Sequence, residues 1–469
     1  MIPPANRGAD FWLLWIYKLW IGGQSPMVDI FIVDDQGPEA TAMLQALYSR
    51  SGESAREHLK QVQERGSAKF MENYYVGYGH ASIGDCGSTT LFVEGLSILA
   101  CKALQDNPLY SGQESSTRYV DFSKQAIVDP INTPASKAIL DQWMGFYLSS
   151  LGPLDAFLKK KFPMGDGEKE RVWTNAIQAR GFDILRGFLP AGIISQLAWS
   201  TNMRQAADKL HLMRHHPLTE VRDIADGCLK ALREKYPSSF GHKDYADTEA
   251  YLAKTASKTN YLDARFFLDN QPDRSFVSTV NNQALEAGER DVIEGRPART
   301  NLPRYLDSYG QYTCTFDLDY GSYRDLQRHR NGVCRIPLLT GERGFHDWYL
   351  SALPEDLQTK ARALVDELYE AIDSLNCRDE DKQYLYPLGA KVRCQTVYTL
   401  PQMVYVIELR AQNTVHSTLR DVMHWMHHEM VQRHPHLTLH TDLAPSKFDI
   451  KRGTQTIFKR DEFNQEVAP

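Results

Sequence analysis

The spacing of apolar residues predicts helices near the start of the chain. Residues 38–51 place apolar side chains at helical intervals, and residues 54–65 are predicted as a more polar helix. Before them, the run VDIFIV at residues 28–33 is typical of a strand. Residues 90–104 form a longer apolar run, which fits either a buried helix or a strand followed by a helix. The first part of the chain is therefore expected to mix helices with at least one strand.

Long amphipathic patterns follow. Residues 134–162 and 175–188 show helical spacing; Gly152-Pro153 is expected to break the first helix, and Leu189-Pro190 ends the second. Residues 196–213 are predicted as a third helix. This half of the chain is thus expected to be mainly helical.

The same order of elements recurs later in the chain. Residues 240–272 are polar and charged, and they are predicted to connect two bodies. Beyond them come an aromatic strand-like run, a short segment ending in a basic triplet and two helical regions, at residues 312–318, 323–330, 355–375 and 400–428. Because this order repeats that of the first body, an internal duplication is expected.

The length of the chain agrees with such a division. At 469 residues it exceeds the size, roughly 250–300 residues, at which a single core stops growing. We predict an N-terminal extension, a first body, a connector and a second body, at residues 1–26, 27–240, 241–272 and 273–469. The apolar segment 11–23 is too short for a membrane span, contains Lys18 and lacks a cleavage site. Neither a membrane anchor nor a signal peptide is therefore expected.

Composition narrows the class of protein. The net charge of -6 gives no reason to expect binding to nucleic acid or to a membrane. The seven cysteines are scattered without a C-x-x-C pair, which indicates reduced thiols in the cytoplasm and neither disulfides nor a zinc site. Neither G-x-G-x-x-G nor a P-loop is present, so a Rossmann enzyme and an NTPase are both disfavoured.

The stretch Ser111–Tyr119, SGQESSTRY, carries the densest chemistry of the chain. If it is extended, Glu114, Ser116 and Arg118 point to the same side. A guanidinium that grips an anion, a hydroxyl and a carboxylate that accepts an N–H together suit a nucleotide. The alternative is a solvated, hydrogen-bonded turn.

This stretch and the motifs around it resemble the flavin-dependent thymidylate synthases. Ser111–Tyr119 is similar to the central motif of that family, with Gln113 in place of Asn. The other motifs of the family follow in nearly the expected order and spacing, as His80–Asp85, Arg186–Pro190, Asn202–Arg204 and Met213-Arg214. The Arg-His-Arg triplet that precedes the central motif in the family is replaced here by Asp106-Asn107-Pro108.

The missing triplet occurs in the second body. Arg328-His329-Arg330 begins 222 residues after Asp106, but the serine, glutamate and arginine of the central motif do not follow it. Further on, Glu408–Arg410 and Leu419-Arg420 are expected to match the late motifs Asn202–Arg204 and Met213-Arg214. In both bodies the two arginines are ten residues apart. Each body thus lacks one half of the central motif, which the other body retains.

The resemblance implies an α/β (α+β) fold made of two copies of the flavin-dependent thymidylate synthase fold, with long helices around mixed or antiparallel sheets. The family works as a homotetramer with sites between subunits, so a chain with two copies is expected to form a homodimer with a tetramer-like assembly. The implied activity is that of an FAD-dependent methyltransferase acting on dUMP or a related pyrimidine nucleotide. Methylene-tetrahydrofolate would supply the carbon, and NADPH would reduce the flavin. A non-catalytic nucleotide- or flavin-binding homologue, with a regulatory or assembly role, is the alternative. A flavoenzyme for another pyrimidine modification is a third possibility.

The resemblance also assigns roles to residues. Glu114, Ser116 and Arg118 are the expected catalytic residues, with no protein nucleophile attacking the base. Since planar guanidinium forks bind phosphate well, arginines dominate the expected substrate site, which comprises Ser111, Gln113, Glu114, Ser116, Arg118, Tyr119, Arg186, Arg214, Arg410 and Arg420. The cofactor site is expected to comprise His80, Asn202, Arg204, Arg328, His329 and Arg330.

Histidines elsewhere do not predict a metal site. The group between His424 and His440 lacks the H-E-x-x-H spacing, so interfacial or surface roles are favoured over metal binding. His211, His215 and His216 flank Arg214 and are expected either near the nucleotide or in packing.

Overall fold

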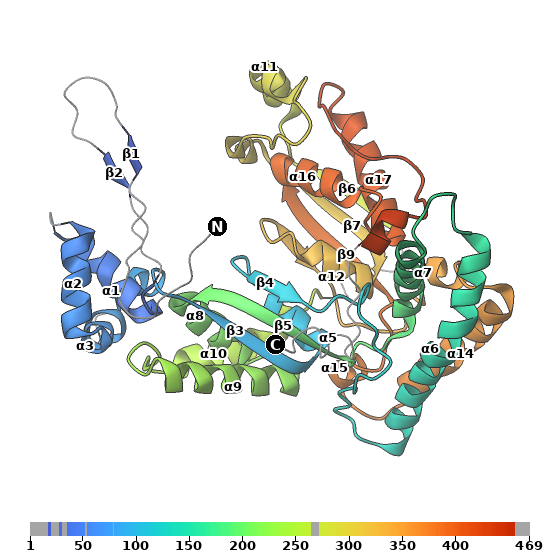
Figure 1. Cartoon of the computed structure of the whole chain (residues 1–469), viewed down its shortest axis with the longest axis horizontal. Coiled ribbons are helices and arrows are strands. Elements are labelled where there is room, and N and C mark those ends of the chain that lie inside the picture. Colours follow the sequence, from blue (N-terminus) through green and yellow to red (C-terminus); the bar gives the residue numbers. More distant parts are fainter. Residues whose placement is uncertain are drawn as a thin grey trace, which may run out of the picture. The chain divides into compact units, whose positions relative to one another are not determined.

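The computed structural model describes residues 17–19, 28–30, 35–51, 54–77, 79–263 and 272–454. The described residues form two compact units (Figure 1). The smaller unit takes residues up to Thr89 together with 202–204 and 232–242, and the larger unit takes the others. The units do not coincide with the two predicted bodies, because the larger unit contains most of both. Most of the apolar segment 11–23 lies outside the described residues.

The smaller unit is mainly helical. Strands β1 (Tyr17–Leu19) and β2 (Val28–Ile30) pair antiparallel, so the described part of the strand predicted at 28–33 is a strand. Both predicted helices are confirmed, as α1 (Pro38–Tyr48) and α2 (Ala55–Arg65). Short helical segments follow as α3 (Ala68–Phe70), a π-helical stretch (Met71–Gly77) and α4 (Ala81–Gly84).

The first sheet is built from β3 (Ser88–Ser97), β4 (Ser111–Glu114) and β5 (Ile194–Asn202), in the order β3-β5-β4. The apolar run 90–104 is a strand followed by a helix, because β3 leads into α5 (Ile98–Gln105). Ser97 begins that helix, since its hydroxyl accepts a hydrogen bond from Ala100 N at 3.0 Å.

The helix predicted at residues 196–213 is only half correct. Its first part is strand β5, and the helices α8 (Met203–Met213) and α9 (Thr219–Lys235) come after it. Within β5, Leu197, Trp199 and Thr201 are buried at every second position, which is the period of a strand. The residues between them are only partly buried or exposed, so this alternation is the signal that the helical interpretation missed.

The second sheet is antiparallel throughout. Its strands lie in the order β6-β7-β9-β8 and span Arg274–Ser278 (β6), Gln311–Asp319 (β7), Val333–Arg335 (β8) and Lys391–Thr399 (β9). Helix α12 (Tyr320–Gln327) follows β7, and α16 (Leu400–Arg410) and α17 (Ser417–Arg433) follow β9. The predicted strand 312–318 is confirmed. Strand β9 was not predicted.

The two sheets show the expected duplication. The order β3-β5-β4 recurs as β7-β9-β8, and the helices after β5 and β9 match in length, with 11 residues in α8 and α16 and 17 residues in α9 and α17. The strand register repeats as well. In the first sheet Ser111 of β4 pairs with Ser200 of β5, and in the second sheet Val333 of β8 pairs with Val397 of β9. Ser111 and Val333 each begin their strand and are 222 residues apart. The fold is therefore α+β, as the resemblance implied.

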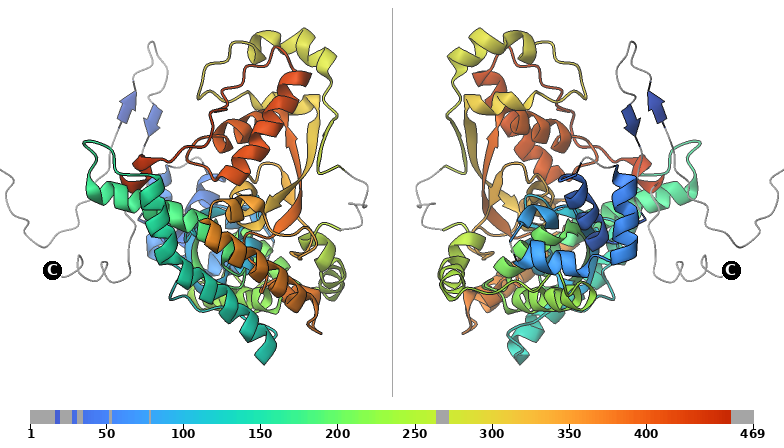
Figure 2. Two further views of the ribbon diagram at one scale, coloured as in Figure 1. Left: turned by 90° about the vertical axis from the view of Figure 1, so that its right-hand side faces the viewer. Right: turned by 90° about the vertical axis from the view of Figure 1, so that its left-hand side faces the viewer.

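Long helices join the two halves of the larger unit, which are its parts within the predicted first body (residues 27–240) and second body (residues 273–469). Helix α6 (Pro134–Lys161) packs on α7 (Glu170–Leu185) and on α14 (Glu355–Asp373), and Figures 1 and 2 both show α6 beside α14. The predicted break at Gly152-Pro153 is wrong. Helix α6 continues through both residues, which are exposed, while Leu154 and Leu158 anchor the following turns in the core.

Shorter elements complete the larger unit. The predicted connector contains α10 (Ala246–Asn260), and the second half adds α11 (Asn282–Ile293), a 3-10 helix (Arg304–Tyr309), α13 (Asp347–Ser351), α15 (Asp379–Lys382) and a terminal 3-10 helix (Ile450–Thr454). A 3-10 turn (Arg186–Phe188) follows α7. None of the helices in the described ranges combines the length and the apolar content that crossing a membrane requires.

Replacing Gly145 by alanine is expected to stabilise the protein by about 0.5–1 kcal/mol, measured by chemical denaturation. Gly145 is exposed inside α6, and a Cβ atom there would meet no atom within 4 Å. Gly95 in β3 provides the control. Its φ of 80° disfavours any side chain, so alanine there should destabilise the protein although the space is equally open. Equal effects of the two substitutions would contradict this account.

Candidate functional site

The central motif is a short strand followed by a turn. Strand β4 ends at Glu114, and Ser116 begins a turn in which its hydroxyl accepts a hydrogen bond from Arg118 N at 3.3 Å. Backbone hydrogen bonds from Tyr119 N and Val120 N to Ser116 O close this turn. The prediction that Glu114, Ser116 and Arg118 alternate along one extended run is therefore wrong.

The Glu114 carboxylate connects the first sheet to the second half of the larger unit. It accepts a hydrogen bond from Gln105 Nε2 at 2.8 Å and forms an ion pair with Arg324 of α12. Both members of this ion pair are buried, with 2% and 7% of the side chains exposed. The motif did not identify Arg324. It lies four residues before Arg328, one helical turn away, and this spacing was the available signal.

Arg118 binds a carboxylate that the sequence did not single out. Its Nε and Nη2 atoms contact the two oxygens of Asp183, in α7, at 2.6 and 3.0 Å, and Nη1 donates to Thr414 O at 3.1 Å. Asp183 also forms an ion pair with Arg452. Burial alone would raise the pKa of Asp183, but Arg118 and Arg452 hold it well below its usual range.

Arg452 reaches Asp183 because the terminal 3-10 helix packs closely on α7. The neighbouring Gly453 makes this approach possible, since a Cβ there would lie 1.7 Å from Val172 O. Arg452 also lies over the Tyr119 ring, at 5.1 Å from its centroid. No motif pointed to this C-terminal arginine.

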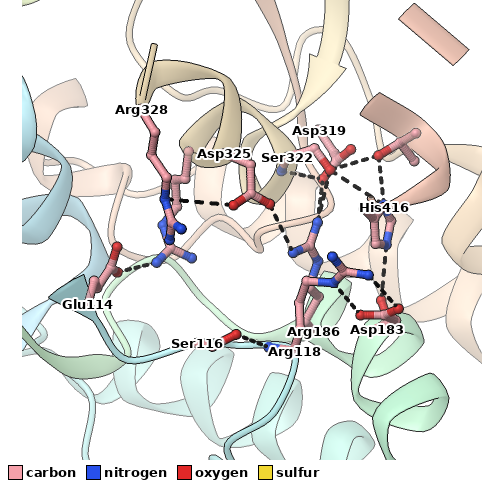
Figure 3. A network of polar contacts seen from close by, with 12 residues as sticks. Glu114, Ser116, Arg118, Asp183, Arg186, Asp319, Ser322, Asp325, Arg328 and His416 are labelled. Carbon is pink, nitrogen blue, oxygen red and sulfur yellow. Dashed lines mark hydrogen bonds and ion pairs between the residues drawn. The ribbon is translucent and has the colours of Figure 1, made fainter. Parts of the chain in front are cut away.

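Arg186 lies at the centre of a buried polar network between the two halves (Figure 3). Its Nη2 donates to Ser322 Oγ at 2.9 Å, and its guanidinium lies 3.8 Å from Asp319 and 3.9 Å from Asp325. Asp319 caps α12 by accepting from Ser322 N at 2.8 Å. The sequence named Arg186, but its acidic and hydroxyl partners from the second half were not predicted.

His416 links this network to α7. Its Nε2 lies 3.3 Å from Asp183 O, and its Nδ1 lies 2.8 Å from the hydroxyl of Thr418, which also contacts Ser322. Burial and the nearby Arg186 hold the pKa of His416 well below its usual range, so the ring is neutral at pH 7.

The Arg328-His329-Arg330 triplet follows α12 and contacts both halves. Arg328 is the exposed member, with 42% of its side chain accessible, and its Nε lies 3.8 Å from Asp325 Oδ1. Arg330 donates to Gln105 O at 2.9 Å and lies over the Tyr110 ring at 4.6 Å. The second-half triplet is thus packed against the first-half segment that leads into Ser111–Tyr119.

His329 is held as a neutral acceptor. Its Nε2 accepts a hydrogen bond from Arg410 Nε at 2.6 Å. Burial and the adjacent Arg410 lower the pKa of His329 to about 3. Arg410 was predicted to bind substrate, and it lies against the triplet.

Cationic groups outnumber anionic ones where the two half-motifs come close together. Asp325 shows the imbalance. Burial would raise its pKa, but Arg328 and Arg186, followed by Arg410 and Arg118, lower it. Counting the ion-paired and neighbouring groups gives seven arginines, Arg118, Arg180, Arg186, Arg324, Arg328, Arg410 and Arg452, against four carboxylates, Glu114, Asp183, Asp319 and Asp325. An anionic ligand would reduce this excess of positive charge.

A cavity of about 660 Å³ opens beside the triplet. Its wall includes His329, Asn331, Tyr398, Gln402 and Tyr405. A volume of this size, with aromatic walls and a few polar groups, is typical of sites for organic cofactors. A much smaller cavity of about 20 Å³ lies among Arg118, Arg180, Asp183, His416 and Arg452.

Other predicted residues of the larger unit have partners outside this network. Arg214 contacts Asp226 and Asp244, both at 3.2 Å. Arg420 is buried and donates to Ala411 O at 2.7 Å, as well as to backbone and side-chain oxygens between Asp442 and Ser446. Arg420 therefore holds the C-terminal segment in place, and its carbonyl partners leave little of the guanidinium for a phosphate.

Two further predicted substrate residues, Ser111 and Gln113, are exposed on β4.

Three predicted cofactor residues belong to the smaller unit. Arg204 forms an ion pair with Asp85, with Nε 2.8 Å from Oδ1, and Arg50 Nη2 lies 3.3 Å from His80 Nδ1. Asn202 ends strand β5. Their assignment to a flavin remains a prediction.

The matching of the late motifs was wrong. Arg204 lies in the first turn of α8, whereas Arg410 is the last residue of the equivalent helix α16 and therefore corresponds to Met213. Arg420 is the fourth residue of α17, as Arg222 is of α9. The common spacing of ten residues is a coincidence, and the second half does not repeat Asn202–Arg204.

Comparison with known proteins agrees with this architecture. Residues 32–238 match the family model described as thymidylate synthase complementing protein. A UPF0159 protein of Chlamydia pneumoniae is 24% identical over 428 residues, covering 79% of each chain. The UPF0159 protein Ta1429 of Thermoplasma acidophilum is 22% identical over 469 residues, covering 84% of this chain and 93% of its own. Both alignments are longer than the segment that the family model matches, so the similarity includes part of the second half.

Proposed function

We propose that this chain is an FAD-dependent methyltransferase of the thymidylate synthase type, because residues 32–238 match the family model described as thymidylate synthase complementing protein. Its proposed substrate is dUMP or a related pyrimidine nucleotide, with methylene-tetrahydrofolate as carbon donor and NADPH as reductant. The observation that carries the proposal is that the two complementary half-motifs lie close together. Glu114 of the first forms an ion pair with Arg324, one helical turn before the triplet, and Arg330 of the triplet lies over the ring of Tyr110, which precedes Ser111.

The excess of guanidinium groups supports the binding of a phosphate. Arg328 is the exposed arginine of the cluster, and its ion pair with Asp325 is long, at 3.8 Å. A phosphate dianion at this position would accept charge-assisted hydrogen bonds from the Arg328 guanidinium, which among the described residues is held only by that long ion pair. Arg410 lies close by and adds positive potential, since its Nε contacts His329. These residues would hold the anionic end of a nucleotide or of the flavin.

The cavity beside the triplet fits a flavin in size and in the chemistry of its wall. His329, Asn331, Gln402, Tyr398 and Tyr405 supply hydrogen-bonding groups and aromatic faces. When bound, the reduced flavin would supply the reducing equivalents for methylation. The neutral ring of His329 remains a hydrogen-bonding group without adding charge to a region rich in cations.

The contribution of the protein to the reaction is positioning and electrostatics. Ser116 lies in the turn between Glu114 and Arg118, where its hydroxyl would bind the substrate and polarise it without attacking the base. The buried Arg118–Asp183 pair fixes the end of that turn. A homodimer, with two such chains in a tetramer-like arrangement, is part of the proposal.

One observation favours a second candidate, a non-catalytic nucleotide- or flavin-binding protein with a regulatory or assembly role. Glu114 is bound by Gln105 and Arg324, and Arg118 is bound by Asp183, so both would have to exchange partners to contact a substrate. In addition, Asp106 stands where the triplet of the first half would be. Binding without turnover would follow if those exchanges do not occur.

The test is direct. The purified full chain is expected to be yellow, to release FAD on denaturation and to form dTMP from dUMP with methylene-tetrahydrofolate and NADPH, measured by chromatography. Binding of FAD or dUMP without dTMP formation would replace the enzyme by the second candidate. If neither ligand binds after reconstitution with FAD, both candidates are wrong.

A further inference from the structure

Three side chains converge at the end of α8, away from the polar network described above. His211 and His215 lie four residues apart and therefore on the same face of the chain as it leaves the helix. Glu249, in the first turn of α10, reaches both of them. Its Oε1 lies 2.9 Å from His211 Nε2, and its Oε2 lies 3.0 Å from His215 Nε2. Potential ligand atoms of the three residues are within 4.8 Å of one another.

A hydrogen bond does not account for all of this geometry. The Oε1 atom of Glu249 is buried and accepts no hydrogen bond, although the nitrogen of His211 is only 2.9 Å away. The contact therefore has the distance of a hydrogen bond without its direction. Two atoms bound to one tetrahedral zinc ion lie about 3.3–3.4 Å apart, given bonds of about 2.0–2.1 Å. Small side-chain rotations would bring the observed separations to that value.

The surroundings suit a cation. The carboxylate of Asp244 lies 3.9 Å from His211 Nδ1, and Arg214 keeps it there through a contact of 3.2 Å. The side chains of His211, His215 and Glu249 are 30%, 14% and 27% exposed, so water can reach the cluster and complete a coordination shell. The third nearby histidine, His216, instead accepts a hydrogen bond from Leu218 N.

We propose that His211, His215 and Glu249 form a binding site for a divalent transition-metal ion, with zinc as the best match. Two imidazoles and one carboxylate, with an open fourth position, are a common zinc ligand set. Imidazole also favours zinc, copper and nickel over magnesium and calcium, which prefer oxygen ligands. The ion would connect the end of α8 to the beginning of α10, where the sequence predicted only a polar connector. This site is independent of the proposed nucleotide chemistry.

The experiment uses the untagged full chain, dialysed against zinc and then against metal-free buffer, with bound zinc measured by mass spectrometry. One zinc ion per chain is expected for the unchanged protein and for His428→Ala, which removes an exposed histidine of α17. His211→Ala and Glu249→Gln should each lower the zinc affinity by at least about 100-fold, since even residues that only orient a ligand contribute about 10–100-fold. Circular dichroism of each variant checks that it is folded.

Cobalt provides a second readout that identifies the ligands. Substitution with Co²⁺ is expected to give visible absorption bands that change in His215→Ala and are unchanged in His428→Ala. A chain that binds no zinc at micromolar concentration would overturn the proposal. The same conclusion would follow if folded His211→Ala and Glu249→Gln both retained full affinity, because the ion would then be bound elsewhere.

Discussion

Asp183→Ala is expected to lower the free energy of unfolding by about 3–5 kcal/mol, because it would leave the guanidiniums of Arg118 and Arg452, which are 15% and 9% exposed, without their carboxylate. Arg118 and Arg452 both form ion pairs with Asp183, and 2% of the Asp183 side chain is exposed. The two arginines come from the central motif and from the C-terminal segment, so one substitution would loosen both attachments to α7. Urea denaturation followed by circular dichroism would measure the change.

A matched control and a pH series would separate this effect from the general loss of an ion pair. Asp155 pairs with Lys159 in α6 at 2.8 Å, but these side chains are 35% and 40% exposed. Asp155→Ala should therefore cost at most about 0.5 kcal/mol. Similar losses for Asp183→Ala and Asp155→Ala would contradict the assignment of Asp183 as the anion that holds the two arginines.

The acid dependence of stability has a defined sign. The pKa of Asp183 is depressed in the folded protein, so its contribution is complete above the unfolded value of about 4 and is lost as the pH falls below it. Asp183→Asn should therefore lose less stability than the unchanged protein between about pH 5 and pH 2. An equal loss in both proteins over that range would contradict the depressed pKa.

Local patterns were sufficient for much of the fold. Helices with a clear apolar period and a capping residue, such as α2 after Ser54, were predicted within one residue. Strand β5 was misread because no loop separates it from α8: the strand ends at Asn202 and the helix begins at Met203, so the two periods merge. The uninterrupted α6 shows the opposite error. A proline on an exposed face is tolerated when buried residues on both sides hold the helix, and burial is not visible in a local pattern.

The candidate site was only partly accessible from sequence for a related reason. The motifs identified Arg118, Arg186 and Arg328, and their complementarity predicted that two halves meet. The groups that hold these arginines, Asp183 and Asp325, lie in helices where a carboxylate is unremarkable. Their importance depends on tertiary contacts between segments more than 60 residues apart, as for Arg118 and Asp183. The match of the late motifs failed because equal spacing in sequence placed Arg204 and Arg410 at opposite ends of equivalent helices.

Arg328→Ala is expected to weaken the binding of an anionic ligand by a factor of roughly 10–150, which corresponds to about 1.5–3 kcal/mol for hydrogen bonds to a charged group. Stability should change little, since the side chain is 42% exposed and its ion pair with Asp325 is 3.8 Å long. The measurements are FAD content after gel filtration and dUMP affinity by calorimetry. A loss confined to FAD would support the division in which the triplet serves the flavin, and a loss confined to dUMP would assign Arg328 to the nucleotide.

The control variant must remove the same positive charge at a position away from the proposed site. Arg362 in α14 is 53% exposed and lies 4.0 Å from Asp347, so Arg362→Ala removes one positive charge from the surface and should leave both ligands unaffected. Arg118→Ala is not an equivalent probe, because Arg118 also neutralises the buried Asp183 and its removal would reduce stability together with binding. If Arg328→Ala binds both FAD and dUMP as the unchanged protein does, Arg328 contacts neither ligand, and the proposed ligand site lies elsewhere.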